Sequence, residues 1–174
     1  MNILAQWFPN VASRFPEFVD SFVQTLIMIG VAGVIAFILA TLFAVILTLT
    51  QRDGLAQQVV IFNILDKLVN LFRSIPFIIL AAALVPFTRA LVGTAIGTKG
   101  AIFPLVVGIT PFFTRQIQSA LAGVDTGLIE AAESMGMSTS KIVYRVYLRE
   151  SIPSIIRVSI IAIVSLIGLT AIVG

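Results

Sequence analysis

The residues whose types and spacing are most informative lie between positions 124 and 138. Glu130 is followed by Ala131 and Ala132, and Gly136 stands four residues further on. A glycine at this place predicts a left-handed residue that ends a helix and turns the chain. The Glu130 carboxylate can pair with a basic side chain of a partner protein, which is binding chemistry and not catalysis. An ordinary interfacial loop is the alternative that the pattern leaves open.

The same stretch indicates two short amphipathic helices joined by that turn. Asp125 or Thr126 is placed to cap the first helix, and Ser138 is placed to cap the second. Each helix has an apolar face, and the face of the second is expected to pack on the rest of the protein. These faces consist of Leu128, Ile129, Ala132 and Met135 in the first helix and Ile142, Val143, Val146 and Tyr147 in the second. A compact helix pair of this kind has the shape of a docking element.

Basic residues recur at intervals of four on the second helix, at Lys141, Arg145 and Arg149. They are expected to face either lipid headgroups or a partner. Together with Arg52 they also give a weak excess of positive charge on one side of the membrane. By the positive-inside rule this places residues 125–149 in the cytoplasm and the N-terminus outside.

A second candidate site lies where a predicted helix is interrupted. Arg73 and Ser74 precede Pro76 within an otherwise apolar stretch, and a proline inside a helix kinks or unwinds it. The Arg73 guanidinium can bind a substrate carboxylate through two parallel hydrogen bonds. It can equally satisfy backbone carbonyls that Pro76 leaves without a donor. Arg73, Ser74 and Pro76 are therefore the residues expected along a translocation path.

Several kinds of chemistry are excluded by what the chain lacks. It contains no histidine and no cysteine, which removes zinc sites built on these residues, disulfides and an imidazole base. The glycine-rich residues 93–100 do not have the spacing of a phosphate-binding loop. No catalytic residue, metal site or cofactor is predicted on this chain. An intramembrane enzyme would need paired carboxylates, and only Asp66 is placed to supply one.

The composition explains where these elements must sit. Of the 174 residues 59% are hydrophobic and 11% are charged, with a mean hydropathy of +1.10; soluble domains carry about 25% charged residues. The chain is therefore predicted to be an integral protein of the lipid bilayer. Its lysines and arginines are scattered and do not form a patch, which argues against a nucleic-acid partner.

Four membrane spans are expected, at about residues 19–50, 59–87, 99–122 and 152–174, with the loop at about 125–149 facing the cytoplasm. Residues 21–51 are uncharged, more than the roughly 20 residues that cross a bilayer. Prolines interrupt the later spans, which suits a bundle lining a path better than a non-transporting membrane anchor. The predicted fold is all-α: residues 1–174 form one polytopic transmembrane helix bundle.

The loop residues carry a family resemblance. Glu130-Ala131-Ala132, Gly136 and, after nine intervening residues, Val146-x-Leu148 resemble the EAA loop of ATP-binding-cassette (ABC) importer permeases. Arg149 stands where that family usually has a proline. Upstream, the segments 70–80, 86–89 and 92–97 are similar to methionine import permeases. The similar region covers roughly residues 24–174.

The resemblance implies a type I ABC importer permease of the bacterial cytoplasmic membrane. It imports methionine or, as the alternative, another amino acid. Such permeases have five spans, so the four seen here imply a truncated chain or a missing last helix. The family works as a homodimer with two cytoplasmic ATPase subunits, which hold ATP and magnesium, and an extracytoplasmic substrate-binding protein. The coupling residues implied are Glu130, Ala131, Ala132, Gly136, Lys141 and Arg145.

Overall fold

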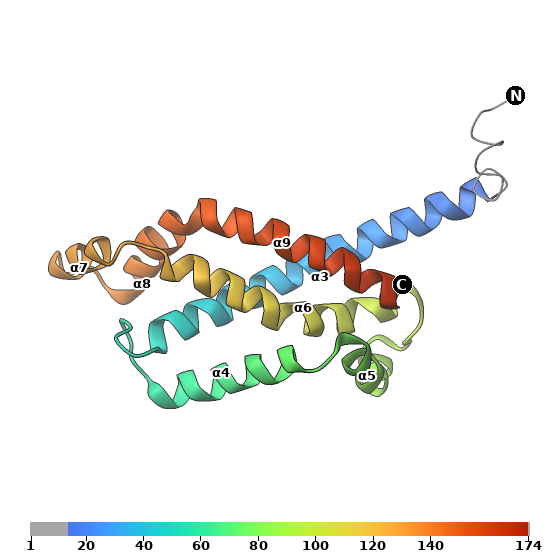
Figure 1. The fold of residues 1–174 in the computed structure, drawn as a ribbon, viewed down its shortest axis with the longest axis horizontal. Helices are drawn as coiled ribbons and strands as arrows, with labels where there is room; N and C mark the ends of the chain where they lie inside the picture. The colour runs from blue at the N-terminus through green and yellow to red at the C-terminus, as the bar shows by residue number, and fades with distance from the viewer. Residues whose placement is uncertain (1–13, 174) are drawn as a thin grey trace, which may run out of the picture.

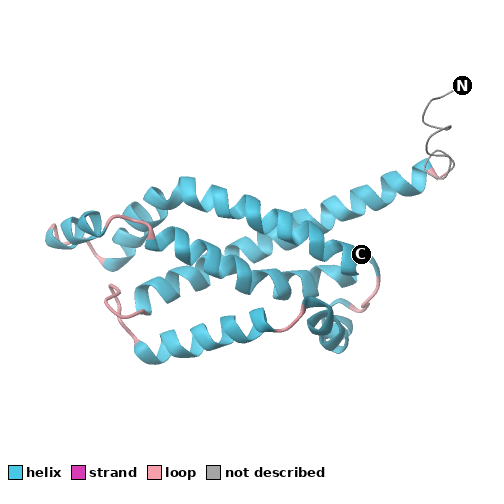
Figure 2. Ribbon diagram, in the orientation of Figure 1, coloured by secondary structure: helices cyan, strands magenta, loops and turns pink. Residues whose placement is uncertain are grey.

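The computed structural model describes residues 14–173. Within that range all regular elements are helical, and they are joined by short loops (Figure 2). The all-α prediction is confirmed. Three helical segments of the described residues are long and apolar enough to cross a membrane, and the helix pair Val59–Ser74 and Phe77–Val92 adds a fourth if it is counted as one broken span.

The first described helix, α3, runs over Phe15–Thr50 and has 36 residues. At 1.5 Å per residue it is about 54 Å long, well beyond the roughly 30 Å of a bilayer core. One narrow stripe is buried at intervals of four: Met28, Ala32, Ala36, Ala40 and Ala44. Because the stripe consists mostly of alanines, a neighbouring helix can approach the α3 backbone closely. Most of the large apolar side chains of α3 point away from the bundle.

The predicted second span is divided into α4, Val59–Ser74, and α5, Phe77–Val92, which meet at an angle of 108°. Ile75 is extended at the break, with φ −83° and ψ 123°, as expected before a proline, and Pro76 has no N–H to continue the helix. Each half has 16 residues, about 24 Å, which is too short to cross the bilayer alone.

Helix α6, Gly97–Ala122, lies at the centre of the bundle. In its most apolar window 61% of the residues are buried, against 22% in α3. It contacts α3 most extensively and also packs on α5, on α4 and on the last helix, α9 (Arg149–Val173). Pro104 and Pro111 lie inside it and are buried. The central position of α6 makes it the element that joins the others.

The chain then forms α7, Thr126–Ser134; α8, Thr139–Ile142; the π-helix η1, Val143–Leu148; and α9, Arg149–Val173. The last three form one continuous helical segment of 35 residues. The expected fourth span, at 152–174, is therefore the later part of a longer helix whose described residues end at Val173. The wider turns of η1 lead into α9 without a break, and Pro153 lies inside the helix.

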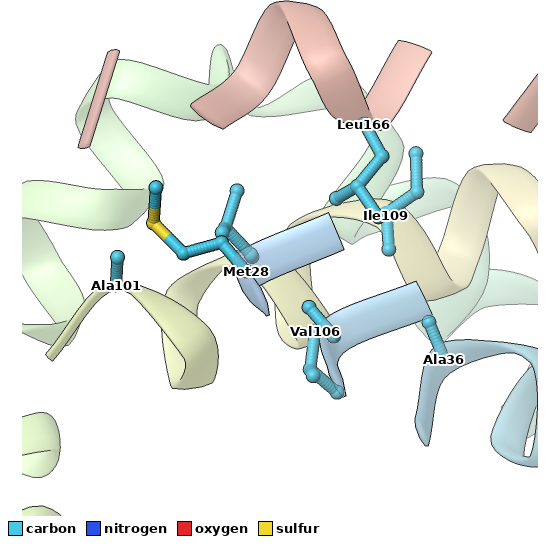
Figure 3. Close-up of a cluster of buried hydrophobic side chains, with 8 residues drawn as sticks. Met28, Ala36, Ala101, Val106, Ile109 and Leu166 are labelled. Carbon is cyan, nitrogen blue, oxygen red and sulfur yellow. The ribbon is translucent and has the colours of Figure 1, made fainter. Parts of the chain in front are cut away.

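Two apolar clusters hold the helices together. In the first, Met28 and Ala36 of α3 meet Ala101, Val106 and Ile109 of α6 and Leu166 of α9 (Figure 3). In the second, nearer α7, alanines of α3 pack against Phe113 and Ile117 of α6 and Ala162 of α9. Both clusters join the same three helices, so α3, α6 and α9 form the body of the protein.

The loops gather at two ends of this body. The loop between α3 and α4 lies at the same end as α7 and α8, whereas the start of α3, the α5–α6 loop and the end of α9 lie towards the opposite end (Figure 1). This arrangement agrees with the expected topology, in which residues 51–58 and 125–149 face the same compartment.

Candidate functional site

The predicted turn after α7 is present, and its hydrogen bonds show how it forms. Asp125 caps α7, its Oδ1 accepting from the amide of Gly127 at 2.7 Å. At the other end the amide of Gly136 donates to the Glu133 carbonyl at 2.8 Å, and that of Met137 to Ala132 at 3.1 Å. Gly136 has φ +71°, which only glycine adopts without strain. Both local predictions, the cap and the left-handed glycine, are confirmed.

Ser138 occupies the N-cap position of α8, but its side chain makes no capping hydrogen bond there. Its hydroxyl lies 3.4 Å from that of Ser140. Ser138 therefore occupies the predicted N-cap position, but the predicted capping hydrogen bond is not formed.

The predicted coupling residues lie together at one end of the molecule. Glu130, Ala131 and Gly136 are exposed on α7 and its turn, and Lys141 and Arg145 are exposed on the following helix. The second alanine of the motif, Ala132, is only 2% exposed. The small side chain of Ala132 therefore allows α7 to lie close to the elements beneath it.

The apolar residues of α7 do not form one buried face. Ala132 is buried and Ile129 is half-buried, whereas Leu128 is 47% exposed and Met135 is 74% exposed. Tyr144 on η1 is also 74% exposed. On the second helix the expected packing does occur: Ile142 is buried, and Tyr147 contacts the cluster of α3, α6 and α9. Exposed apolar side chains beyond the spans are typical of a protein interface.

A half-polar cavity of about 360 Å³ opens between α7, the end of α6 and the loop that follows α3. Glu130 and Glu133 line it from α7, and Tyr147 lines it from η1. Burial raises the pKa of Tyr147, and the nearby Glu133 carboxylate raises it further. The buried hydroxyl of Thr48, which also lines this cavity, has no hydrogen-bond partner among the described residues. Residues 51–55 thus lie beside the motif, which sequence analysis did not anticipate.

The three residues expected along the translocation path lie at the break between α4 and α5. The Ser74 hydroxyl donates to the Leu71 carbonyl at 2.7 Å, and Pro76 occupies the N-cap position of α5. Arg73 is exposed and lines a cavity of about 230 Å³. Ser74 and Pro76 shape the break but do not line that cavity.

A polar network that sequence analysis missed joins α4 to α6. The Arg115 guanidinium forms an ion pair with the Asp66 carboxylate and donates to Asn70 Oδ1 at 3.0 Å and to Gln118 Oε1 at 2.8 Å. The sequence did contain a signal for this network, namely one acidic and one basic residue in separate apolar helices. Charged side chains at membrane depth usually pair with one another.

Comparison with known proteins identifies the class. Residues 54–174 match the family described as "Binding-protein-dependent transport system inner membrane component". The chain belongs to this family. It is a multi-pass protein of the cytoplasmic membrane and a transport subunit, not an enzyme, as predicted.

Individual relatives narrow the comparison. The chain is 40% identical over 173 residues to the probable D-methionine transport system permease protein MetI of Vibrio cholerae, covering 99% of this chain and 76% of the relative. It is 40% identical over 169 residues to the methionine import system permease protein MetP of Bacillus subtilis, covering 97% and 75%. A chain of the MetNI methionine ABC transporter, solved in inward-facing conformations, superposes with a TM-score of 0.87 at 36% identity, covering 98% and 75%. The predicted resemblance to ABC importer permeases is confirmed.

Proposed function

We propose that this chain is the membrane-spanning subunit of an ATP-driven importer of methionine. The two relatives described above, each 40% identical to this chain, are named as methionine permeases, and the superposed chain comes from a methionine ABC transporter. The alternative is a permease of the same family that imports a different amino acid. The two are separated by transport measurements.

The working assembly that we propose contains two copies of this chain, two ATPase subunits and an extracytoplasmic binding protein. ATP and magnesium belong to the ATPase subunits. In this proposal the chain depends on that separate motor for its energy.

The ATPase docks on α7 and its turn in this proposal. The observation that carries it is the exposure of Leu128, Met135 and Tyr144 at the end of the molecule that bears the motif. Large apolar side chains outside the bilayer lower their free energy by being covered. Glu130 and Glu133 are exposed on the same helix as Leu128, and their carboxylates add a complementary site for basic side chains of the ATPase. Lys141 and Arg145 are exposed on the helical segment that follows the turn.

The helical connections explain how docking moves the membrane part. The central helix α6 ends one turn before α7, and α8 and η1 continue directly into α9. A rigid-body movement of α7 is thus transmitted to two of the three helices of the body. ATP binding would draw the docked ATPases together, and the bundles would switch between inward-open and outward-open states.

The test is to purify the permease with its ATPase, reconstitute the complex in proteoliposomes with the binding protein, and measure methionine uptake and ATP hydrolysis. We expect ATP-dependent uptake that unlabelled methionine suppresses. Competition by other amino acids, measured in the same vesicles, identifies the alternative. A complex that hydrolyses ATP but imports another amino acid would refute the methionine assignment, and failure of any ATPase to co-purify would refute the docking.

A further inference from the structure

A cavity of about 230 Å³ lies beside the break between α4 and α5. It is lined by three parts of the fold: the break itself, the middle of α6 and the later part of α9. Its lining residues are Phe72, Arg73, Ile75, Phe77, Leu80, Gly108, Ile109, Phe112, Ser165 and Leu169. The walls are apolar and aromatic apart from one guanidinium and one hydroxyl, which is the usual composition of a small-molecule site.

Arg73 is the one charged side chain in the lining of this cavity. Its guanidinium makes no hydrogen bond or ion pair with any of the residues that the structure describes. The role of satisfying carbonyls freed near Pro76 is therefore not seen. In contrast, Arg115 makes an ion pair and several hydrogen bonds. The Arg73 donors are available to an anionic group in the cavity.

The break also presents the two ends of a divided helix. The amides of Ile79 and Leu80 donate to the Pro76 carbonyl at 3.0 and 3.1 Å, and within the described residues the amides of Phe77 and Ile78 have no acceptor. The N-terminus of α5 therefore carries partial positive charge, and the C-terminus of α4 carries partial negative charge. Broken helices in transporters use such ends to bind charged groups of their substrates.

The rest of the cavity suits an apolar side chain. Phe77 packs against α6 because position 108 is a glycine: a Cβ there would lie 2.6 Å from Cδ2 of the Phe77 ring. Phe112 and Leu169 complete the apolar wall. The Ser165 hydroxyl donates to the Ile161 carbonyl at 3.0 Å, so its oxygen can still accept from an ammonium group.

The geometry points to this cavity as a binding site for a zwitterionic α-amino acid with an apolar side chain, at an intermediate stage of translocation. Arg73 binds the carboxylate together with the first amides of α5. The ammonium group faces the carbonyl end of α4 and Ser165, and the side chain lies between Phe77, Phe112 and Leu169. A thioether suits such a pocket because sulfur makes favourable contacts with aromatic rings. This inference rests on the proposed function, of which it specifies one site.

The test uses the reconstituted complex with its ATPase and binding protein, and compares wild type with Arg73→Gln, Arg73→Lys and the control Arg157→Gln. Arg157 is an exposed arginine on α9 that does not line the cavity. A charge-assisted bidentate contact corresponds to roughly a ten- to hundredfold change in an equilibrium. We expect Arg73→Gln to lower the rate of methionine uptake by about tenfold or more. Arg73→Lys retains the charge and should lower it less, and the control should match wild type.

Basal ATP hydrolysis without binding protein and co-purification of the ATPase separate a lost binding contact from a lost fold. Both should stay at the wild-type level in the two Arg73 variants. Equal uptake by wild type and Arg73→Gln would overturn the site. If the Arg73→Gln complex fails to assemble, the Arg73→Lys complex tests the site instead. An assembled Arg73→Lys complex with wild-type uptake overturns the site, and one with reduced uptake supports it. A wild-type complex that imports no methionine contradicts the proposed function instead.

Discussion

The Arg115 guanidinium is paired with the Asp66 carboxylate across 49 positions of sequence, and this pair joins α6 to α4. Asn70, one turn further along α4, accepts from the same guanidinium nitrogen and donates to the other Asp66 oxygen at 3.1 Å. The two charged side chains are 20% and 27% exposed. The network is thus a partly buried polar contact between helices that otherwise meet through apolar side chains.

The Arg115–Asp66 pair lies between the two candidate sites, the coupling loop and the break between α4 and α5. Arg115 lies on the last two turns of α6, just before the α7 loop, and Asp66 lies two turns before Arg73 on α4. A movement of α7 that displaces the end of α6 therefore acts on α4 through this pair. The pair is a positioning contact and does not itself touch the cavity at the break.

Replacing Arg115 by glutamine should destabilise the protein, because Asp66 is left as an unpaired carboxylate between apolar helices. Removing one partner of a fully buried pair costs roughly 3–5 kcal/mol. Partial exposure reduces this, and we expect about 2 kcal/mol, measured as a lower midpoint of thermal unfolding in detergent. Uptake per ATP hydrolysed should also fall.

The double variant Asp66→Asn with Arg115→Gln provides the check on that pair. It removes both charges, so part of the lost stability should return. Purely additive losses would show that the two side chains are not energetically coupled. Arg157→Gln again serves as the control, since Arg157 is exposed and forms no ion pair with the residues that the structure describes.

Gly136→Val should uncouple transport from hydrolysis. The residue has φ +71°, and a β-branched side chain in that conformation costs roughly 1–2 kcal/mol or more. The turn would rearrange and α7 would no longer lie at its present angle to α8. Gly123→Ala is the matched control, since Gly123 has φ −81° and an added Cβ would meet nothing closer than 3.5 Å. Wild-type uptake and hydrolysis in Gly136→Val would exclude the turn from coupling.

Glu130→Lys should weaken association with the ATPase by reversing a charge on the proposed docking surface. We expect roughly a tenfold loss of co-purified ATPase at low salt, with a smaller difference at high salt because screening weakens the interaction. Glu150→Lys, a charge reversal at an exposed position on the first turn of α9, is the control. If both variants retain the ATPase equally well, Glu130 does not contribute to docking.

Local features of the coupling loop were predictable from sequence because they depend on neighbouring residues. An Asp two positions before a glycine at a helix start, and Gly136 at its end, fix the hydrogen bonds of α7 wherever the helix lies. The exposure of Leu128 and Met135 was not predictable in this way, since an apolar face does not reveal what covers it. No sequence signal marked the π-helical segment.

Features that depend on distant contacts were only partly predictable. Pro76 indicates a break, but the 108° angle also depends on Phe77 packing against the space left by Gly108. Asp66 and Arg115 are each visible in the sequence as charges within apolar segments. Their pairing depends on the register between α4 and α6, which no local pattern specifies.

Glu133→Gln should lower the pKa of Tyr147. Burial is the larger cause of the raised pKa and the Glu133 carboxylate is the second, so the value should fall without returning to its ordinary range. The ultraviolet titration of tyrosinate measures this in purified protein. The chain has two tyrosines, so Tyr144→Phe leaves Tyr147 as the only one. An unchanged titration would show that Glu133 does not act on the hydroxyl.

The same raised pKa predicts sensitivity to alkali. The folded protein holds the Tyr147 proton more tightly than the unfolded chain does. The two states therefore differ in protons bound only once the pH exceeds the unfolded value of about 10. Below that pH the full stability is retained, and above it stability falls as the pH rises towards the folded pKa. Thermal unfolding of Tyr144→Phe and of its Tyr147→Phe derivative, compared across this range, should diverge only at the alkaline end.

Ala40→Leu should separate α3 from α6. Ala40 is fully buried and contacts the cluster that contains Phe113 and Ile117, so a larger side chain has no space unless the helices move apart. Overpacking of this kind costs typically about 1–3 kcal/mol. Ala90→Leu makes the same change at an exposed position of α5 and should leave thermal stability unchanged. Hydrophobicity rises equally in both variants, so any difference in thermal stability reflects packing. A lower unfolding midpoint in Ala40→Leu alone would show that the alanine stripe allows the helices to pack closely. Equal midpoints in the two variants would show that it does not.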